Sequence, residues 1–537
     1  MLSSSIVPRL GFRDGLARIV GQPAHSRYLD AAIVAALLLL AGALLLPACS
    51  HFPMELWDES RNANNAIEMA INGQWLITTF NGLPDHWNAK PPLLIWMMAA
   101  LLQSGIPALL ALRLPSMVAA MVTVTLLFLF CRVVLQDRLA GVLSALLLLA
   151  SSLFIGPHVS QAGDYDALLS FFILVVVLSF GRYVDAAGLE GSRWLAISGA
   201  AFLLAALTKG VCALFVLPGL FAYLLVKRRL YWASREIRLW LIGLAILVVL
   251  ASYYWGRDAL DPGYLQAVWQ SELGGRYLTH LEAHHRGALY YFFVLLVSFE
   301  PGFLLIPLLI RPLRSSDTPR RDVVLITTLA SVSLLIVVTG AVTKLYWYVA
   351  PLVPLMSLAV GIALADALGQ SKGTFSATAR GSQLLRLAVI AMLGLIIAQN
   401  LNDQNVHYPI EQGQSAIGLV SAGPFIDKLR YAGVTEKLLV IASGTPNDSD
   451  SPEYHPVADF YRKIADAHDF ASVAIVETGD TITAGARVLT CDPEVRPWLH
   501  AAPWFAAIQN DAQCVFGQAR TASTITLATA PITEPRR

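Results

Sequence analysis

Long apolar runs, separated by short polar segments, occupy the chain up to about residue 400 and constrain its fold more than any other feature. A helix needs about 20 mostly apolar residues to cross a bilayer, and most of these runs approach that length. Charged residues make up only 14% of the sequence, against about 25% in soluble domains. We therefore expect a mainly α, polytopic membrane bundle of about eleven spanning helices. The predicted spans lie at about residues 29–47, 113–131, 139–155, 166–184, 194–207, 211–226, 239–255, 289–310, 323–342, 346–365 and 384–398.

The placement of arginine and lysine predicts the orientation of this bundle, because cytoplasmic segments of membrane proteins are enriched in both. Residues 1–28 form an arginine-rich tail, predicted to be cytoplasmic. Later positive clusters lie around Arg132, Arg182, Lys227, Arg320 and Lys372. All of them reach the cytoplasmic side only if the short apolar run 93–105 lies along the membrane without crossing it. The C-terminus is then outside. Residues 194–226 leave two alternatives, a pair of short spans or one long broken helix.

In this orientation four polar segments face the outer side of the membrane. They are the opening loop 48–112, residues 156–166, the long loop 256–288 and the turn 343–348. Charged and aromatic loops gathered on one face of a membrane protein indicate a functional site there. Residues 29–400 are therefore predicted to form a transmembrane catalytic domain.

The composition changes after about residue 400, where a small outer α/β domain is predicted over residues 401–520. Its expected strands and helices are 438–442, 472–477, 487–490 and 514–517 for strands, and 424–431 and 457–467 for helices. Residues 521–537 are rich in Thr, Pro and Ala and are predicted to be a flexible tail. Cys491 and Cys514 form a disulfide if this part faces an oxidising compartment, or else remain free thiols.

The opening loop carries an acidic pair, Asp58 and Glu59, with Asp58 as the predicted N-cap of a short helix that ends at Gly73 and lies on the membrane. A carboxylate at the membrane surface can act as a general base on an acceptor hydroxyl. The alternative for Asp58 is an N-cap that only stabilises the helix.

Lys90 stands directly before Pro91 and Pro92 and close to Trp87. A cation fixed in this way beside an apolar surface suits an anionic lipid phosphate. The alternative is an interfacial lysine that extends its ammonium to water. Arg61 either completes the anion site or pairs with a neighbouring glutamate.

Further candidates lie in the other outer segments. Asp164 and Asp166 stand where a span begins, and one of them is expected to serve as an N-cap. Lys209 lies within an apolar stretch, where an ionisable residue is functional by default. The remaining candidates are His284 and His285 as weak metal ligands, His285 also as a pocket residue, Arg286 and Lys344 as anion-binding cations, and Tyr348 as a phenol on the same side.

Six motifs in order resemble the GT-C glycosyltransferases of the protein O-mannosyltransferase and aminoarabinose (lipid A) transferase type. They are DESRNANNAIEM, NAKPPLLIW, RLPS, DALLSFF, LTKG and KLYWYVAPLVP, and the resemblance covers about residues 30–365. It implies an inverting enzyme that uses a polyprenyl-phosphate sugar at the outer face of a bacterial inner membrane. It also implies roles for individual residues: Asp58 as the base, Asp166 as the second-loop acid, and Lys90, Arg286 and Tyr348 at the donor phosphate.

The sequence departs from the aminoarabinose transferases at Ala89, where those enzymes carry a glutamate that shares a metal with a histidine. A divalent metal therefore stays open as a cofactor, and the acceptor stays open among lipid, glycan and protein. The rival interpretation is a flippase for a lipid-linked sugar, but transporters often show inverted repeats and none is visible here. The net charge of +1 gives no indication of nucleic-acid binding.

Overall fold

The computed structural model divides the chain into two compact units, which are described separately. The first unit comprises Met1–Cys49, Pro84–Leu101 and Ile106–Asp403, and the second Ser50–Leu83, Leu102–Gly105 and Gln404–Arg537. The structure describes residues 21, 23–51, 54–55, 57–278, 286–370, 379–406, 425–426, 438–441, 456–467, 473–476, 480–491, 495–510 and 514–524.

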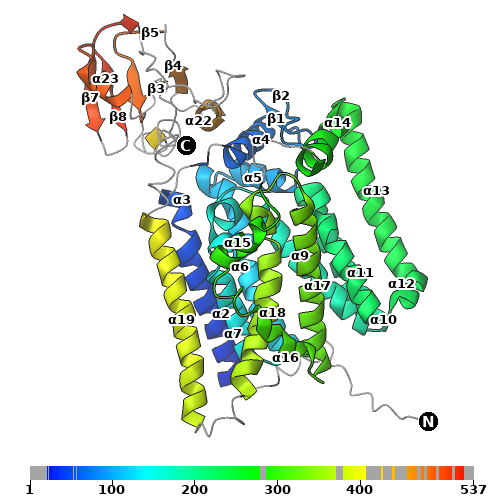
Figure 1. Cartoon of the computed structure of the whole chain (residues 1–537). Coiled ribbons are helices and arrows are strands. Elements are labelled where there is room, and N and C mark those ends of the chain that lie inside the picture. Colours follow the sequence, from blue (N-terminus) through cyan, green and yellow to red (C-terminus); the bar gives the residue numbers. More distant parts are fainter. Residues whose placement is uncertain are drawn as a thin grey trace, which may run out of the picture. The chain divides into compact units, whose positions relative to one another are not determined.

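Within those residues the first unit is an all-helical bundle (Figure 1). Eight helical segments are long and apolar enough to cross a membrane, and a bent pair would make nine. The long helices are α2 (Ala24–Leu45), α6 (Ala108–Val134), α9 (Asp166–Asp185), α10 (Gly188–Lys209), α13 (Ile237–Leu260), α17 (Thr318–Gly340), α18 (Leu352–Gln370) and α19 (Ala379–Val406). The shorter elements are α3 (Ala48–His51), α5 (Leu93–Gln103), α7 (Arg138–Leu149), α8 (Ser152–Ile155), η1 (Pro157–Gln161), η2 (Gly210–Val216), α11 (Leu217–Val226), α12 (Leu230–Arg235), α14 (Tyr264–Val268), η3 (Trp269–Leu278), α15 (Tyr290–Ser298), η4 (Ile306–Leu309), α16 (Ile310–Leu313) and η5 (Tyr346–Val349).

The structure differs from the predicted spans at three places where helices are interrupted. The predicted span 139–155 is α7 followed by α8 and η1, with a bend of 63°. The span predicted at 289–310 is wrong as a continuous helix, because α15 ends at Ser298. The third place is the predicted span 346–365, which is η5 followed by α18 from Leu352. A count of about eleven spans therefore stays a prediction, whereas the membrane bundle itself is confirmed.

Contacts at the two ends of α9 show how residues 188–226 are arranged. Lys209, the last residue of α10, pairs with Asp166, the first residue of α9. Lys227, which follows α11, lies 3.4 Å from Asp185, the last residue of α9. The chain therefore runs along α9 in α10 and returns in η2 and α11, reversing at Gly210 with a φ of +51°. Residues 188–226 therefore form two segments that run in opposite directions along α9, in place of one continuous helix.

We call the two ends of the bundle the Asp166 end and the Asp185 end. Ion pairs between different helices gather at the Asp185 end, where they join α2, α6, α7, α11, α17 and α18. The pairs are Arg132–Asp30 (2.9 Å), Arg138–Asp30 (2.5 Å), Lys227–Asp322 (2.6 Å), Arg320–Asp137 (2.7 Å) and Arg320–Asp366 (2.6 Å). Positive residues from segments far apart in the sequence thus share one end of the bundle, as the positive-inside pattern predicts.

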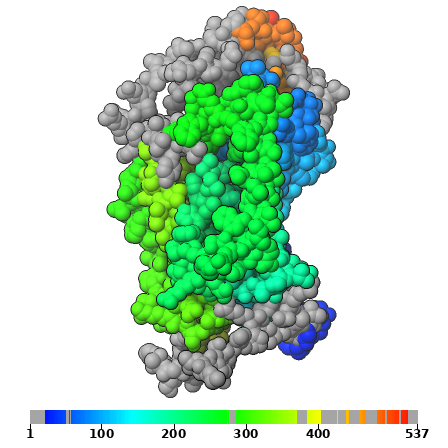
Figure 2. All heavy atoms as spheres, turned by 90° about the vertical axis from the view of Figure 1, so that its right-hand side faces the viewer, coloured from blue at the N-terminus to red at the C-terminus, as the bar shows by residue number. Residues whose placement is uncertain are grey.

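Helix α13 lies at the surface of the first unit with almost no buried side chains. Figure 2 looks onto this face, where the green residues of the α13 region are exposed. Trp240, Leu247 and Trp255 are among its most exposed apolar side chains. An exposed apolar helix of this length is expected for a segment that faces lipid.

The second unit contains α4 (Asp58–Asn72), which ends at Gly73 in the left-handed conformation, as predicted. The prediction that Asp58 is the N-cap is wrong. Trp57 occupies that position without a side-chain hydrogen bond, and Asp58 is the first helical residue. A two-stranded ladder of β1 (Thr79–Phe80) and β2 (Leu83–Pro84) follows α4.

A mixed five-stranded sheet with the order β4-β3-β6-β8-β7 forms the C-terminal part of the second unit. Its predicted strands are present, and β7 is an addition. The described helices and strands of this C-terminal part are β3 (Leu438–Ile441), α22 (Pro456–Ala467), β4 (Val473–Val476), β5 (Thr481–Ile482), β6 (Arg487–Thr490), α23 (Val495–Ala501), β7 (Phe505–Asn510), β8 (Val515–Ala519) and β9 (Ser523–Thr524). Strands β5 and β9 form a separate two-stranded ladder. Strand β3 pairs in parallel with β4 and β6, while β8 is antiparallel to β6 and β7.

Cys491 and Cys514 form a disulfide at the point where β6 ends and β8 begins. It therefore fastens two strands whose last ladder pair is Thr490 with Val515. The alternative of two free thiols is wrong for this structure.

Removing this disulfide should destabilise the C-terminal sheet. Closing a loop of 23 residues stabilises a fold by about 3 kcal/mol in the chain-entropy description. We expect C491S/C514S to lower the denaturant concentration at which half of this part becomes sensitive to protease. The measurement uses the full chain in detergent. Reductant should lower the denaturant midpoint of the wild type and leave the midpoint of C491S/C514S unchanged. Equal resistance of both proteins without reductant would contradict a stabilising role.

Candidate active site

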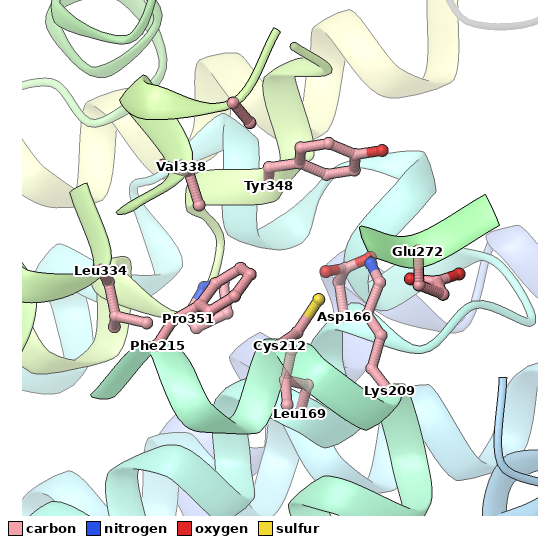
Figure 3. A pocket seen from close by; sticks show the side chains of 11 residues that line it. Asp166, Leu169, Lys209, Cys212, Phe215, Glu272, Leu334, Val338, Tyr348 and Pro351 are labelled. Atoms are coloured by element: carbon pink, nitrogen blue, oxygen red, sulfur yellow. The ribbon is translucent and has the colours of Figure 1, made fainter. Parts of the chain in front are cut away.

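A pocket opens at the Asp166 end of the first unit, with an empty volume of about 630 Å³ that is partly open to solvent. One side is polar and the other apolar. Figure 3 shows Asp166 and Lys209 meeting on one side with Glu272 beyond them, and Leu334 on the opposite side. The other lining residues are Leu169, Cys212, Phe215, Val338, Ala341, Tyr348 and Pro351. Such a lining suits a ligand with a polar head and an apolar tail.

Asp166 and Lys209 form the polar centre of this pocket. Lys209 Nζ donates to Asp166 Oδ2 at 2.6 Å, and both side chains are almost completely buried. Asp166 is placed by the start of α9 and Lys209 by the end of α10, so the reversal at Gly210 brings the two together. A buried carboxylate and ammonium tolerate the loss of water only because they neutralise each other.

Tyr348 reaches the same pocket from the turn that follows α17. The Lys209 Nζ atom lies 5.5 Å from the centroid of the Tyr348 ring. Lys344, predicted as an anion-binding cation, is used differently: its Nζ donates to the backbone oxygen of Ala341 at 2.5 Å. Lys344 therefore satisfies a carbonyl where α17 ends, a favourable place for a cation.

Asp164 lies just before α9 and is buried beside aromatic groups. Its Oδ1 accepts from the backbone N–H of Tyr165 at 2.7 Å, and its Oδ2 is 3.9 Å from His158 Nδ1. The His158 ring stacks on Trp347 at 3.8 Å. Burial alone would raise the pKa of the Asp164 carboxyl, but His158 and the charge of Lys209 outweigh burial and hold that pKa below its usual range. Asp164 is therefore ionised at neutral pH.

Lys90 is only 6% exposed, which fits the prediction of a fixed cation better than a solvated lysine. Its Nζ lies 5.2 Å from the ring centroid of Tyr165 and 5.9 Å from that of Trp87. The Tyr165 hydroxyl accepts a hydrogen bond from the Asn88 amide at 2.9 Å. Among the described residues, no hydrogen bond or ion pair to the Lys90 ammonium is present.

A buried network, which was not predicted from the sequence, holds the backbone next to Lys90. The Tyr264 hydroxyl donates to the backbone oxygen of Ala89 at 2.9 Å. The Arg257 guanidinium, which is fully buried, lies 3.9 Å from the Tyr264 ring centroid. Arg257 Nε is 3.8 Å from Asp261, whose other oxygen is 2.9 Å from His86 Nε2. In the sequence, the feature that could have indicated this network is Arg257, a charged residue just after the apolar run 239–255.

The acidic pair of the opening loop lies in the second unit. Asp58 is half-buried in the first turn of α4, and its carboxylate forms no cap bond there. Glu59 is buried, and its Oε2 accepts from the backbone N–H of Glu55 at 2.9 Å. Arg61 lies over the Phe80 ring at 3.7 Å, and its predicted pairing with an anion or a neighbouring glutamate stays a prediction.

Two predicted groups remain. Arg286 is exposed and stands four residues before α15. His284 and His285 lie outside the described residues, so a metal at these histidines stays a prediction. Trp87 is 41% exposed beside Lys90, an accessible aromatic surface at the same place.

Residues 89–255 match the family model described as dolichyl-phosphate-mannose-protein mannosyltransferase. The chain is 27% identical over 384 residues to an undecaprenyl phosphate-alpha-4-amino-4-deoxy-L-arabinose arabinosyl transferase of Pseudomonas savastanoi pv. phaseolicola, covering 70% of this chain and 68% of the relative. A transferase of the same name from Pseudomonas aeruginosa is 29% identical, covering 68% of this chain and 65% of that relative.

The crystal structure of ArnT from Cupriavidus metallidurans, bound to undecaprenyl phosphate, superposes with a TM-score of 0.62 over 92% of this chain and 98% of that chain. The chain has the GT-C fold of membrane glycosyltransferases. The identity to that structure is 17%, so the likeness there is one of fold. The segment that matches the mannosyltransferase family model includes Lys90, Asp166 and Lys209 but ends before Tyr348.

Lys209→Met should destabilise this bundle, because it removes the ammonium that neutralises the buried Asp166 carboxylate. Breaking a buried ion pair costs about 3–5 kcal/mol. We expect a clear fall in the melting temperature of the purified protein in detergent. The double variant D166N/K209M should recover part of the loss, since no charge remains unpaired. Equal melting of K209M and wild type would show that the pair contributes no stability.

Proposed function

We propose that the chain transfers a sugar from a polyprenyl-phosphate donor to an acceptor hydroxyl or phosphate, with inversion at the sugar carbon. The observation that carries this proposal is the Lys90 ammonium, buried against Tyr165 with no anionic partner among the described residues. An unpaired buried cation is costly, and a ligand's anion would satisfy it. In a GT-C glycosyltransferase that anion is the donor phosphate.

A lipid phosphate as the bound anion also agrees with the names of the relatives. The matched transferases are named for undecaprenyl phosphate, and one neighbouring structure holds it. In our proposal Lys90 binds the phosphate, with Tyr348 and Arg286 as further contacts. The apolar wall of the Asp166-end pocket then takes part of the lipid chain or the acceptor's apolar portion. Cations already fixed before reaction stabilise the charge that develops on the leaving phosphate.

Asp58 is the proposed general base. It takes the proton of the acceptor hydroxyl while that oxygen bonds to the anomeric carbon, and the bond from that carbon to the phosphate oxygen breaks. Attack from the face opposite the phosphate inverts the carbon, and polyprenyl phosphate leaves. Asp58 suits this task better than Glu59, because the Glu59 carboxylate is buried and bonded to the Glu55 amide.

We infer that the reaction takes place on the periplasmic side of a bacterial inner membrane. Two features support this side. The disulfide Cys491–Cys514 is typical of an oxidising compartment. The ion pairs of Arg132, Lys227 and Arg320 gather at the Asp185 end of the bundle, and clustered positive residues are typical of the cytoplasmic side.

The test uses purified protein in detergent with a labelled polyprenyl-phosphate sugar. Asp58→Asn should lose transfer by about 10²–10⁴-fold while still binding undecaprenyl phosphate. Glu59→Gln is its matched comparison and should lose less. Lys90→Met should weaken undecaprenyl phosphate binding, whereas Lys344→Met, which removes a lysine engaged at Ala341, should not.

Release of polyprenyl phosphate on addition of an acceptor extract supports the enzyme. Movement of the labelled lipid between vesicle leaflets without release would support the flippase instead. Full activity of Asp58→Asn would remove Asp58 as the base. Mass spectrometry of envelope glycolipids and glycoproteins, with and without the gene, identifies the sugar and the acceptor.

A further inference from the structure

Lys463, in α22 of the C-terminal part, is enclosed by oxygens from the segment that carries Asp58. Its Nζ lies 2.6 Å from Glu68 Oε1 and donates to Asn64 Oδ1 at 2.7 Å and to Asn81 Oδ1 at 3.0 Å. Glu68 and Asn64 belong to α4, and Asn81 to the turn after β1. The three oxygens match the three N–H donors of one ammonium. The contacts join parts of the chain that are 382 and 399 residues apart.

Further contacts reinforce this junction within the second unit. The Asn64 side-chain amide donates to the backbone oxygen of Pro456, the first residue of α22, at 2.6 Å. Lys463 Nζ also lies 5.2 Å from the centroid of Phe80. The same ring carries the Arg61 guanidinium at 3.7 Å. Arg61 follows Asp58 by one helical turn, so these contacts extend along α4 to its first turn.

Glu68 is held as a carboxylate by its surroundings. Burial alone would raise its pKa, but the hydrogen bonds from Lys463 and the backbone outweigh burial and lower that pKa. The Glu68 oxygens also accept from the backbone N–H groups of Asn81 and Gly82 at 2.7 and 3.2 Å. The carboxylate thus ties the turn after β1 and Lys463 to α4, and it remains charged at neutral pH.

We propose that Lys463 is a positioning residue for the reaction, through which the C-terminal domain fixes α4 and the Asp58 carboxylate. This inference rests on the proposed function of Asp58. A general base must be placed within hydrogen-bonding reach of the proton it removes, and a displacement of about 1 Å can cost about 10²-fold in rate. A small outer domain therefore has a role in the chemistry without contacting the substrate.

The test compares three variants of the full chain. Lys463→Met keeps the length of the side chain and removes the charge, Lys463→Arg keeps the charge, and Arg462→Ala is the matched control. Arg462 is the neighbouring cation, and it pairs with Asp459 on its own helix. We expect Lys463→Met to lower kcat about 10- to 100-fold with little change in the KM for the donor. Lys463→Arg should recover most of the kcat, and Arg462→Ala should resemble the wild type.

Hydrogen exchange of residues 58–72 supplies a readout that does not depend on activity. Lys463→Met should speed amide exchange in α4 and leave α9 unchanged. Glu68→Gln should do the same, and E68Q/K463M should be no worse than the more severe single variant, because both remove one interaction. Unchanged exchange and unchanged kcat in Lys463→Met would overturn the proposal. If α4 exchange depends on Lys463 but Asp58→Asn retains full activity, the role of Asp58 fails while the junction stands.

Discussion

The buried pair of Asp166 and Lys209 determines how the first unit is assembled around its pocket. Asp166 begins α9 and Lys209 ends α10, and their contact at 2.6 Å closes the reversal of the chain at Gly210. Neither charge could lie there alone, because a single buried ion is far too costly. The pair therefore sets the position of α10 along the axis of α9. It also places Cys212 and Phe215 of the returning segment in the wall of the pocket.

The sequence predicts the bundle well because apolar length and charge placement are strong signals in a membrane protein. It also predicts β3, β4, β6 and β8, whose apolar runs are short and bounded by turns. Lys90, Asp166, Lys209 and Tyr348 were among the candidate site residues because a polar residue beside an apolar run stands out, and the last three line the pocket. Their roles stay predictions. Asp58 was misplaced by one position, since local pattern does not distinguish an N-cap from the first helical residue.

The unpredicted features depend on contacts between residues distant in sequence. Tyr264 bonds the backbone of Ala89 across 175 positions, and nothing in the sequence around either residue indicates it. The breaks between α7 and α8 and between α15 and α16 were also not predicted, because a hydropathy average over many residues does not show a short interruption. The attachment of Lys463 to α4 is the most distant of these contacts. Its partners, Asn64, Glu68 and Asn81, look like ordinary surface polar residues in the sequence.

The reversal at Gly210 also has a consequence for biogenesis. The returning segment consists of η2 and the ten-residue α11, which is short for independent partitioning into lipid. Lys209, at the end of α10 just before it, adds a charge that lipid accepts poorly. Because the contact with Asp166 offsets the charge of Lys209, we expect α9, α10 and α11 to settle in the bilayer together.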